Sequence, residues 1–356
     1  MDKIKEFYSY DKIFTYDHLY KSYLKCRKGC NWKASVQRFN SQASYNVYKI
    51  YIKLKKRQWK HGDYYEFDRI ENGKLRHIQA EYFQDRIVQR CFCDYSLLPI
   101  LTPKLIYDNS ASQKNKGIDF ALRRCKKHLQ DHINAYGDDG YVLQFDFHHY
   151  FESIQHEKVY KILENIYTDK DILRVAISMI DKFKNGLGLG SQLSQTIALY
   201  YPNRLDHKIK EFYHIKGYGR YMDDGYIISN DKQQLNEILG YLQKWSNDYG
   251  IPLNEKKTHI TKLSKAFTFL KRKYIITNDN KIVITLDKHN VHKMKRKIKL
   301  LKQKFNRANE YIYQLFNSWC LAFMKWNCYT QLSQLKIYTN KIIKGGFKWN
   351  KTSKLN

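Results

Sequence analysis

An acidic pair between two apolar half-strands constrains the fold of this chain more than any other feature of its sequence. Asp223, Asp224 and Gly225 interrupt a segment rich in Tyr and Ile, so Tyr218–Ser229 predicts a β-hairpin with these three residues at its tip. Two carboxylates buried without partners would cost free energy. Two interpretations follow: an exposed polar turn, or a site that binds divalent cations.

A second carboxylate favours the cation site. Tyr141–Asp146 predicts a short apolar strand that ends on Asp146, directly after a turn cluster at residues 136–140. Carboxylate oxygens are the ligands that Mg²⁺ prefers, and water and substrate phosphates complete its octahedral shell. Two such ions can activate a hydroxyl nucleophile and stabilise a leaving pyrophosphate. A strand-end Asp beside the hairpin pair suits that chemistry.

The charge of the chain points to a polyanionic partner. Its 356 residues include 64 Lys and Arg against 34 Asp and Glu, a formal net charge of +30. Such a charge on an enzyme-sized chain indicates nucleic acid, although an ordinary solvated basic surface has the same composition. The charge is concentrated in the run from Lys53 to Lys60 and in residues 291–307. In the second segment an apolar stripe at three- and four-residue steps predicts a helix with a cationic outer face.

Other broad classes are disfavoured. No run of about 18 apolar residues occurs, and the polar N-terminus lacks the apolar core of a signal peptide, so we expect no membrane span and a cytoplasmic location. The seven cysteines include no pair spaced as in a zinc finger, which argues against structural zinc.

Periodicity and turn signals predict further elements along the chain. A helical pattern runs over 79–101, and the helix itself is expected to stop before Pro99. Further helices are predicted over 119–133, 155–165 and 233–249. Another is predicted to begin at the Gly-rich loop 186–190 and to be shortened by Pro202. The predicted strands are 267–276 and 281–286.

Tyr221-Met222-Asp223-Asp224 resembles the YMDD box of reverse transcriptases, and other blocks follow that family in the same order from Arg76 to Ile276. Asp146-Phe147-His148-His149-Tyr150-Phe151 is similar to the family's motif A, and Leu189-Gly190 with Ser194-Gln195 is similar to its motif B. The blocks 76–89 and 108–117 resemble the fingers motifs, Asn254-Glu255-Lys256-Lys257-Thr258 resembles motif D, and Phe267-Thr268-Phe269-Leu270 resembles the primer grip.

This resemblance implies an α+β, right-hand polymerase fold with fingers, a palm built on an antiparallel sheet, and a helical thumb. We expect fingers with a basic N-terminal extension at 1–140, the palm at 141–285 and a basic helical thumb and tail at 286–356. Residues 186–205 would straddle fingers and palm. The two cationic segments and the Lys-rich tail would line a cleft for the template and primer.

The resemblance also implies roles for single residues and a cofactor of two Mg²⁺ ions, with Mn²⁺ as an alternative. The catalytic residues would be Asp146, Asp223 and Asp224, and the metal ligands these three with the Phe147 carbonyl. The incoming dNTP would meet Arg76, Lys114, Phe151, Gln195 and Lys257, with Phe151 as a steric gate against ribonucleotides and Lys257 as a general acid or a plain surface lysine. Nucleic acid would bind Lys293, Arg296, Lys297 and Lys304.

The implied function is RNA-directed DNA synthesis, that is, nucleotidyl transfer on an RNA template and an RNA/DNA duplex. The form Leu-Gly-x-x-x-Ser-Gln of motif B resembles the enzymes of diversity-generating retroelements, which work with a small basic accessory protein. An antiviral defence enzyme that works with a noncoding RNA is an alternative. So is a catalytically idle RNA-binding protein on the same fold, although the intact Asp residues favour an enzyme. A group II intron maturase is disfavoured by the short thumb segment.

Overall fold

Four antiparallel strands form the sheet that holds the acidic residues. In this computed structural model, which describes residues 8–344 except 72–73, 325 and 327, their order is β4-β5-β3-β6. Their bounds are β3 (Tyr141–Asp146), β4 (Gly217–Tyr221), β5 (Asp224–Ser229) and β6 (His259–Lys262). The bounds of β3 are those that the sequence predicts, because an apolar run with turn residues before it can hardly extend further.

The two faces of this sheet pack into different parts of the core. Successive side chains of a strand point to opposite faces. Leu143, Phe145 and Ile227 pack with the main cluster, which includes the buried face of α14 (Lys232–Tyr249). Val142 and Ile228 pack instead with α8 (Ile118–Tyr136) and the C-terminal elements. The sheet is therefore covered on both faces.

Two smaller antiparallel units flank the central sheet. One is the hairpin of β1 (Tyr65–Glu71) and β2 (Lys74–Ala80); the other is the three-stranded sheet of β7 (Phe267–Phe269), β8 (Arg272–Ile276) and β9 (Ile282–Leu286). The prediction of one strand over 267–276 is wrong, since Leu270 and Lys271 both take left-handed backbone angles and turn the chain back. No Gly, Asn or Asp marks this turn in the sequence.

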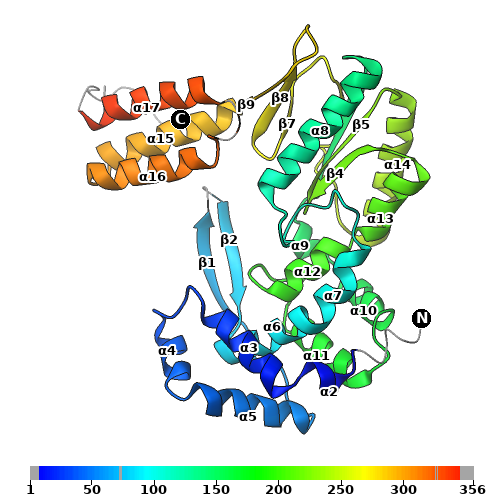
Figure 1. Cartoon of the computed structure of the whole chain (residues 1–356), viewed down its shortest axis with the longest axis vertical. Helices are drawn as coiled ribbons and strands as arrows, with labels where there is room; N and C mark the ends of the chain where they lie inside the picture. The colour runs from blue at the N-terminus through cyan, green and yellow to red at the C-terminus, as the bar shows by residue number, and fades with distance from the viewer. Residues whose placement is uncertain (1–7, 72–73, 325, 327, 345–356) are drawn as a thin grey trace.

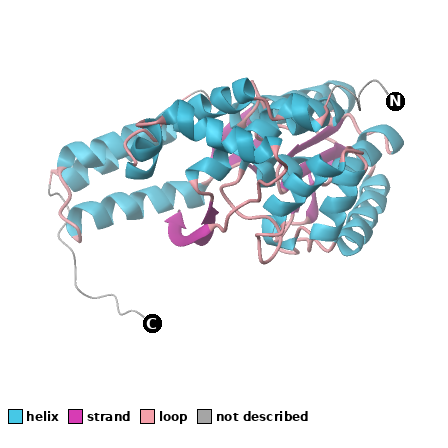
Figure 2. Ribbon diagram, turned by 90° about the horizontal axis from the view of Figure 1, so that it is seen from below, coloured by secondary structure: helices cyan, strands magenta, loops and turns pink. Residues whose placement is uncertain are grey.

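Helices make up most of the remaining described chain (Figure 2). Before the central sheet in the sequence, the helices besides α8 are α2 (Tyr10–Ile13), α3 (Tyr16–Arg27), α4 (Ala34–Asn40), α5 (Ala43–Lys55), α6 (Phe83–Phe92), a π-helical turn (Cys93–Leu97), α7 (Leu98–Leu101) and a 3₁₀ turn (Thr102–Lys104). Between the strands of the sheet lie α9 (Tyr150–Ser153), α10 (His156–Glu164), α11 (Lys170–Ile180), α12 (Gln192–Tyr200), α13 (Asn203–His207) and a second π-helical turn (Lys208–Phe212). The last three are α15 (Lys288–Gln303), α16 (Asn309–Leu321) and α17 (Tyr329–Ile343).

The predicted helix over 79–101 needs correction at both ends. Its first residues belong to β2, where they pair with β1, so α6 begins only at Phe83. The helix also does not stop before Pro99, which lies in the first turn of α7. The helix can continue through Pro99 because a π-helical turn precedes it at Cys93–Leu97. A π-helical turn is wider than an α-helical one, so the proline ring has room beside the carbonyls of the preceding turn.

The C-terminal helices and the N-terminal helices lie at opposite ends of the molecule. Figure 1 places α15, α16 and α17 at one end and α3, α4 and α5 at the other, with the hairpin β1–β2 between them. The cationic run from Lys53 to Lys60, which begins in α5, therefore does not lie beside the cationic helix α15. None of the helices in the described ranges is long and apolar enough to cross a membrane.

Candidate active site

Asp146 occupies the last position of β3, which lies beside β5, the strand that begins with Asp224. It is 5% exposed and pairs across the sheet with Asp224, the first residue of β5. Side-chain nitrogens from the loop before β6 contact both of its carboxylate oxygens. Asn254 donates from Nδ2 to Oδ1 at 2.9 Å, and the Lys257 ammonium lies 2.7 Å from Oδ2.

The hairpin tip differs from the prediction by one residue. Tyr221 pairs with Asp224, so the two-residue turn consists of Met222 and Asp223, with Met222 at a φ of 55°. Asp224 belongs to β5, which turns it toward Asp146. Gly225 is needed inside the strand rather than at the tip, because a Cβ there would collide with the ring of Phe145.

The acidic pair is electrostatically crowded. Burial raises the pKa of Asp224 to about 8, and a hydrogen bond with Asp146 and the charges of both neighbouring carboxylates act in the same direction. The pKa of Asp223 is also raised, first by burial and then by the charge of Asp146, while Lys257 and Arg76 oppose the rise. Three carboxylates thus face a single close ammonium group, and a divalent cation would relieve their repulsion.

The donor set fits Mg²⁺ or Mn²⁺ in its chemistry, since it consists of carboxylate oxygens at one sheet end. Within the described parts of the chain, no group of three or more His, Cys, Asp or Glu side chains is already arranged to hold a metal ion. The backbone N–H of Phe147 donates to the Asp223 carbonyl at 3.1 Å, which fixes the start of the loop after β3 against the hairpin turn.

Arg220 holds the acidic turn from behind, a feature that the sequence reasoning missed. Its guanidinium pairs with Asp206 at 2.6 Å, and both side chains are fully buried. It also donates to the carbonyls of Met222 at 2.8 Å and Leu199 at 2.9 Å, and the hydroxyl of Tyr218 donates to the same Asp206. One buried cation thus connects the hairpin turn to the end of α12.

Phe151 lies in α9, five positions after Asp146, and its half-buried ring packs against the main cluster. The Leu187 N–H donates to the Phe151 carbonyl at 2.7 Å, which joins α9 to the Gly-rich loop. Gly186 in this loop has a φ of 56°, and a Cβ there would collide with that same carbonyl. Only glycine therefore permits this close approach.

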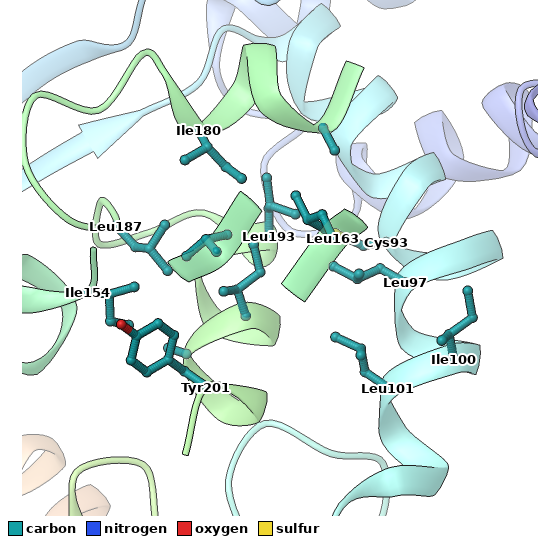
Figure 3. Packing of buried hydrophobic residues seen from close by; sticks show 14 of the residues in the cluster. Cys93, Leu97, Ile100, Leu101, Ile154, Leu163, Ile180, Leu187, Leu193 and Tyr201 are labelled. Atoms are coloured by element: carbon teal, nitrogen blue, oxygen red, sulfur yellow. The ribbon is translucent and has the colours of Figure 1, made fainter. Parts of the chain in front are cut away.

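Gln195 is exposed on α12, and Gln89 fixes the start of this helix. The side-chain oxygen of Gln89 accepts hydrogen bonds from the Ser191 hydroxyl and the Gln192 N–H, at 3.1 and 3.0 Å. Figure 3 shows the apolar support of the same region: Leu187 from the loop and Leu193 from α12 pack among buried side chains that include Leu97 and Leu163.

Arg76 and Lys114 occupy different surroundings. Arg76 lies on β2, close enough to Asp223 to lower its pKa, and its cross-strand neighbour on β1 is Arg69, which the sequence reasoning also missed. Since opposed residues of an antiparallel pair share one face, both guanidinium groups lie on one side of the hairpin. Lys114 is exposed in the loop before α8, and no contact between it and the acidic residues is seen in the described chain.

Three of the cations expected to bind nucleic acid share the exposed side of α15. They are Lys293, Arg296 and Lys297, while the buried residues of this helix are Met294 and Ile298. The helix begins early, at Lys288, because the Asp287 side chain caps it. It ends at Gln303, so Lys304 follows the helix. The last residue of the predicted apolar stripe, which comprises Val291, Met294, Ile298, Leu301 and Phe305, is 58% exposed rather than packed.

Comparison with known families decides the classification. Residues 54–301 match the model of the reverse transcriptase (RNA-dependent DNA polymerase) family. The chain belongs to the reverse transcriptase family. The matched range of the reverse transcriptase domain includes Asp146, Asp223, Asp224 and Lys257, and most of α15.

Among solved structures, the reverse transcriptase chain is similar to the telomerase of Candida albicans, which was solved in complex with a TWJ fragment of telomeric RNA. The likeness covers 87% of this chain and 66% of that chain, with 13% identity and a TM-score of 0.49. No functional conclusion follows from a likeness at this level. No curated protein matches the sequence.

Proposed function

We propose that this reverse transcriptase copies an RNA template into cDNA by two-metal-ion nucleotidyl transfer. The observation that supports this most directly is the position of Asp146 beside Asp224 and the Asp223 turn, in a chain of that family. Burial and the neighbouring carboxylates raise the pKa of both Asp223 and Asp224, and a divalent cation bound between the three carboxylates would offset their repulsion.

Asp146, Asp223 and Asp224, with the Phe147 carbonyl, would hold two Mg²⁺ ions, or Mn²⁺ in their place. When bound, such ions activate the primer 3′-hydroxyl and stabilise the leaving pyrophosphate. Lys257 holds the Asp146 carboxylate in place through their hydrogen bond and can donate a proton toward the pyrophosphate side. Its neighbour Asn254 orients the same carboxylate from the other oxygen.

The incoming dNTP would lie against residues from three elements. Arg76, with Arg69 opposite it, would bind the triphosphate, because one guanidinium group can donate two parallel hydrogen bonds to a phosphate group. Lys114 would act at longer range. Phe151 would exclude a ribose 2′-hydroxyl, and Gln195 would contact the nucleotide or the template base.

The proposed domains are fingers at 1–140, palm at 141–285 and thumb with tail at 286–356, with 186–205 between fingers and palm. Lys293, Arg296 and Lys297 on α15 and Lys304 after it would bind the phosphate backbone of the template and primer. Contacts of this kind carry little sequence preference, and binding should weaken steeply as salt rises.

We further propose a diversity-generating type of system, in which a small basic protein assists and errors concentrate at template adenines. Its support is the motif B form at Leu189-Gly190 and Ser194-Gln195. An antiphage enzyme with a noncoding RNA is the competing assignment, and a cytoplasmic location suits both. Sequencing of cDNA made on a template of even composition tests this, since errors spread evenly over the four template bases would count against the diversity-generating type.

Primer extension on an RNA template with dNTPs and Mg²⁺ tests the central proposal. Asp223→Asn should lower the rate at least about 100-fold, because a ligand of the proposed ions loses its charge. Asp248→Asn, an exposed residue at the end of α14, is the matched control. Extension that persists in Asp223→Asn would refute catalysis at this site. If the unaltered chain shows no extension and binds RNA as tightly as Asp223→Asn does, the protein is the catalytically idle RNA-binding protein.

A further inference from the structure

The start of α12, the helix that carries Gln195, is held by a side chain from another element. The first N–H groups of a helix have no acceptor within the helix itself. Here the N–H groups of Gln192 and Leu193 donate to the side-chain oxygen of Gln89 on α6, at 3.0 and 3.3 Å. The Ser191 hydroxyl donates to the same oxygen at 3.1 Å. Gln89 is 1% exposed, so one oxygen shielded from water fixes the first turn of α12 against α6.

Glu81 lies on the other side of the Gln89 amide. It is the first residue after β2, and one of its carboxyl oxygens accepts a hydrogen bond from Gln89 Nε2. Burial raises the pKa of Glu81 to about 7, and an oxygen can accept in the protonated form as well as in the ionised form. A flip of the amide would turn its NH₂ group toward the N–H groups of α12, which can only donate. Glu81 therefore holds Gln89 in the one orientation that suits α12.

The same buried cluster includes the end of strand β2, which carries Arg76. A Cβ at Gly188, in the Gly-rich loop before α12, would lie 2.9 Å from the side-chain oxygen of Gln79 on β2. Strand and loop are therefore in close contact. The π-helical turn after α6 adds a further bond, since Gln192 Nε2 donates to Asp94 at 3.0 Å. The hairpin β1–β2, α6 and the start of α12 thus meet at one joint.

We propose that Glu81 and Gln89 are positioning residues for the incoming nucleotide. Glu81 orients Gln89, and Gln89 keeps the helix of Gln195 in a fixed place relative to the strand of Arg76. This inference rests on the proposed function, in which Arg76 and Gln195 are the contacts of the dNTP. When the joint loosens, only a fraction of the molecules present both contacts together, and the apparent affinity for the nucleotide falls by that fraction. The KM for dNTP therefore rises, while saturating dNTP restores the rate.

Single-nucleotide extension of a primer on an RNA template, measured over a range of dNTP concentrations, tests the proposal. Glu81→Leu and Gln89→Leu should each raise KM about tenfold and change kcat by less than about threefold, because a buried hydrogen bond of the joint is lost. The double variant should be no worse than Gln89→Leu alone, since Glu81 acts through Gln89. Glu81→Gln keeps an oxygen that can accept from Gln89, so it should retain the KM of the unaltered chain.

Tyr10→Phe is the matched control. It also removes a buried hydrogen bond, from the Tyr10 hydroxyl to the Leu54 carbonyl at 3.0 Å, but at α2 rather than at the joint. It should leave KM unchanged. If Gln89→Leu does not fold, the two Glu81 variants and this control decide the question. The proposal is overturned if KM is the same in Glu81→Leu as in the unaltered chain, or if Tyr10→Phe raises KM as much as Glu81→Leu does.

Hydrogen exchange at the start of α12 gives a second measurement, which needs no catalysis. The amides of Gln192 and Leu193 should exchange at least about tenfold faster in Glu81→Leu, and Glu81→Gln should keep them protected. Unchanged exchange in Glu81→Leu, beside normal extension by the unaltered chain, refutes this inference alone. No extension by the unaltered chain, beside faster exchange in Glu81→Leu, refutes the proposed function and with it the role in nucleotide binding.

Discussion

The ammonium group of Lys257 lies 2.7 Å from the Oδ2 atom of Asp146, the acidic residue at the end of the central strand. Burial lowers the pKa of Lys257, but its hydrogen bond and charge interaction with Asp146 outweigh this and leave the pKa raised. The lysine is therefore charged at neutral pH. Any cation that binds this oxygen of Asp146 must share it with the ammonium group or displace it.

Lys257→Met should therefore bind Mn²⁺ more tightly than the unaltered chain, by about fivefold, because a half-exposed ion pair is worth about 1 kcal/mol. It should also slow single-turnover primer extension at least about tenfold if Lys257 donates a proton. Calorimetric titration with Mn²⁺ in the absence of nucleotide measures the first effect, and rapid-quench extension the second. Lys256→Met, an exposed neighbour of equal charge, is the control, and Mn²⁺ affinity that is the same in all three chains would contradict the competition.

The buried pair of Arg220 and Asp206 should be costly to break and replaceable as a unit. Arg220→Met leaves an uncompensated buried carboxylate and should lower the free energy of unfolding by about 3–5 kcal/mol. Replacing the network with apolar residues, Arg220→Met with Asp206→Leu and Tyr218→Phe, should restore much of that loss. Urea unfolding of both variants measures the two values.

The same triple variant separates stability from positioning. The Met222 and Leu199 carbonyls lose their donor in it, so the acidic turn is no longer held to α12. Primer extension should therefore remain at least about tenfold slower even where stability is regained. A triple variant that recovers both stability and extension would show that Arg220 has no positioning role.

Elements with a strong local pattern could be predicted from the sequence. The strand before Asp146 was predicted at its observed bounds, and α14 begins one residue before its predicted start. The proximity of Asp146 to the hairpin pair was also expected, because Asp146 ends an apolar strand and the pair lies at a turn between two apolar half-strands. Local hydrophobicity and turn residues are sufficient for such elements.

Contacts between distant segments could not be predicted in the same way. Nothing near Asp206 in the sequence distinguishes it from a surface acid, yet it is fully buried against Arg220. Nor does the sequence indicate where α5, whose last turn contains Lys53 and Lys55, lies in the molecule. Figure 1 places this helix at the opposite end from α15. The turn at Leu270 and Lys271 lacks any residue that favours left-handed backbone angles.

Phe151→Ala should reduce the preference for dNTPs over ribonucleotides at least about tenfold, because the ring would no longer fill the space of a 2′-hydroxyl. Steady-state extension with each nucleotide type, compared as kcat/KM, gives the ratio. Phe151→Tyr keeps the ring and should retain the preference. If the alanine variant discriminates as well as the tyrosine variant does, the half-buried ring serves only the packing of α9.

Asp85 should make stability depend on pH, independently of the acidic site. It is 4% exposed at the start of α6, and burial raises its pKa to about 6, although the Gly62 N–H hydrogen bond acts in the opposite direction. In the unfolded chain the carboxyl titrates near its ordinary value, so the native state holds the proton more tightly. Its contribution to stability is therefore full below that value and is lost as the pH rises through about 6.

Asp85→Asn should accordingly gain stability over the unaltered chain as the pH is raised. The gain should be larger at pH 8 than at pH 5 by about 1–2 kcal/mol, because the neutral amide has no proton to lose and can still accept from Gly62. Urea unfolding of both chains at the two pH values measures the difference, with Asp248→Asn as an exposed control. A gain of equal size at pH 5 and pH 8 would mean that Asp85 keeps its ordinary pKa in the folded chain.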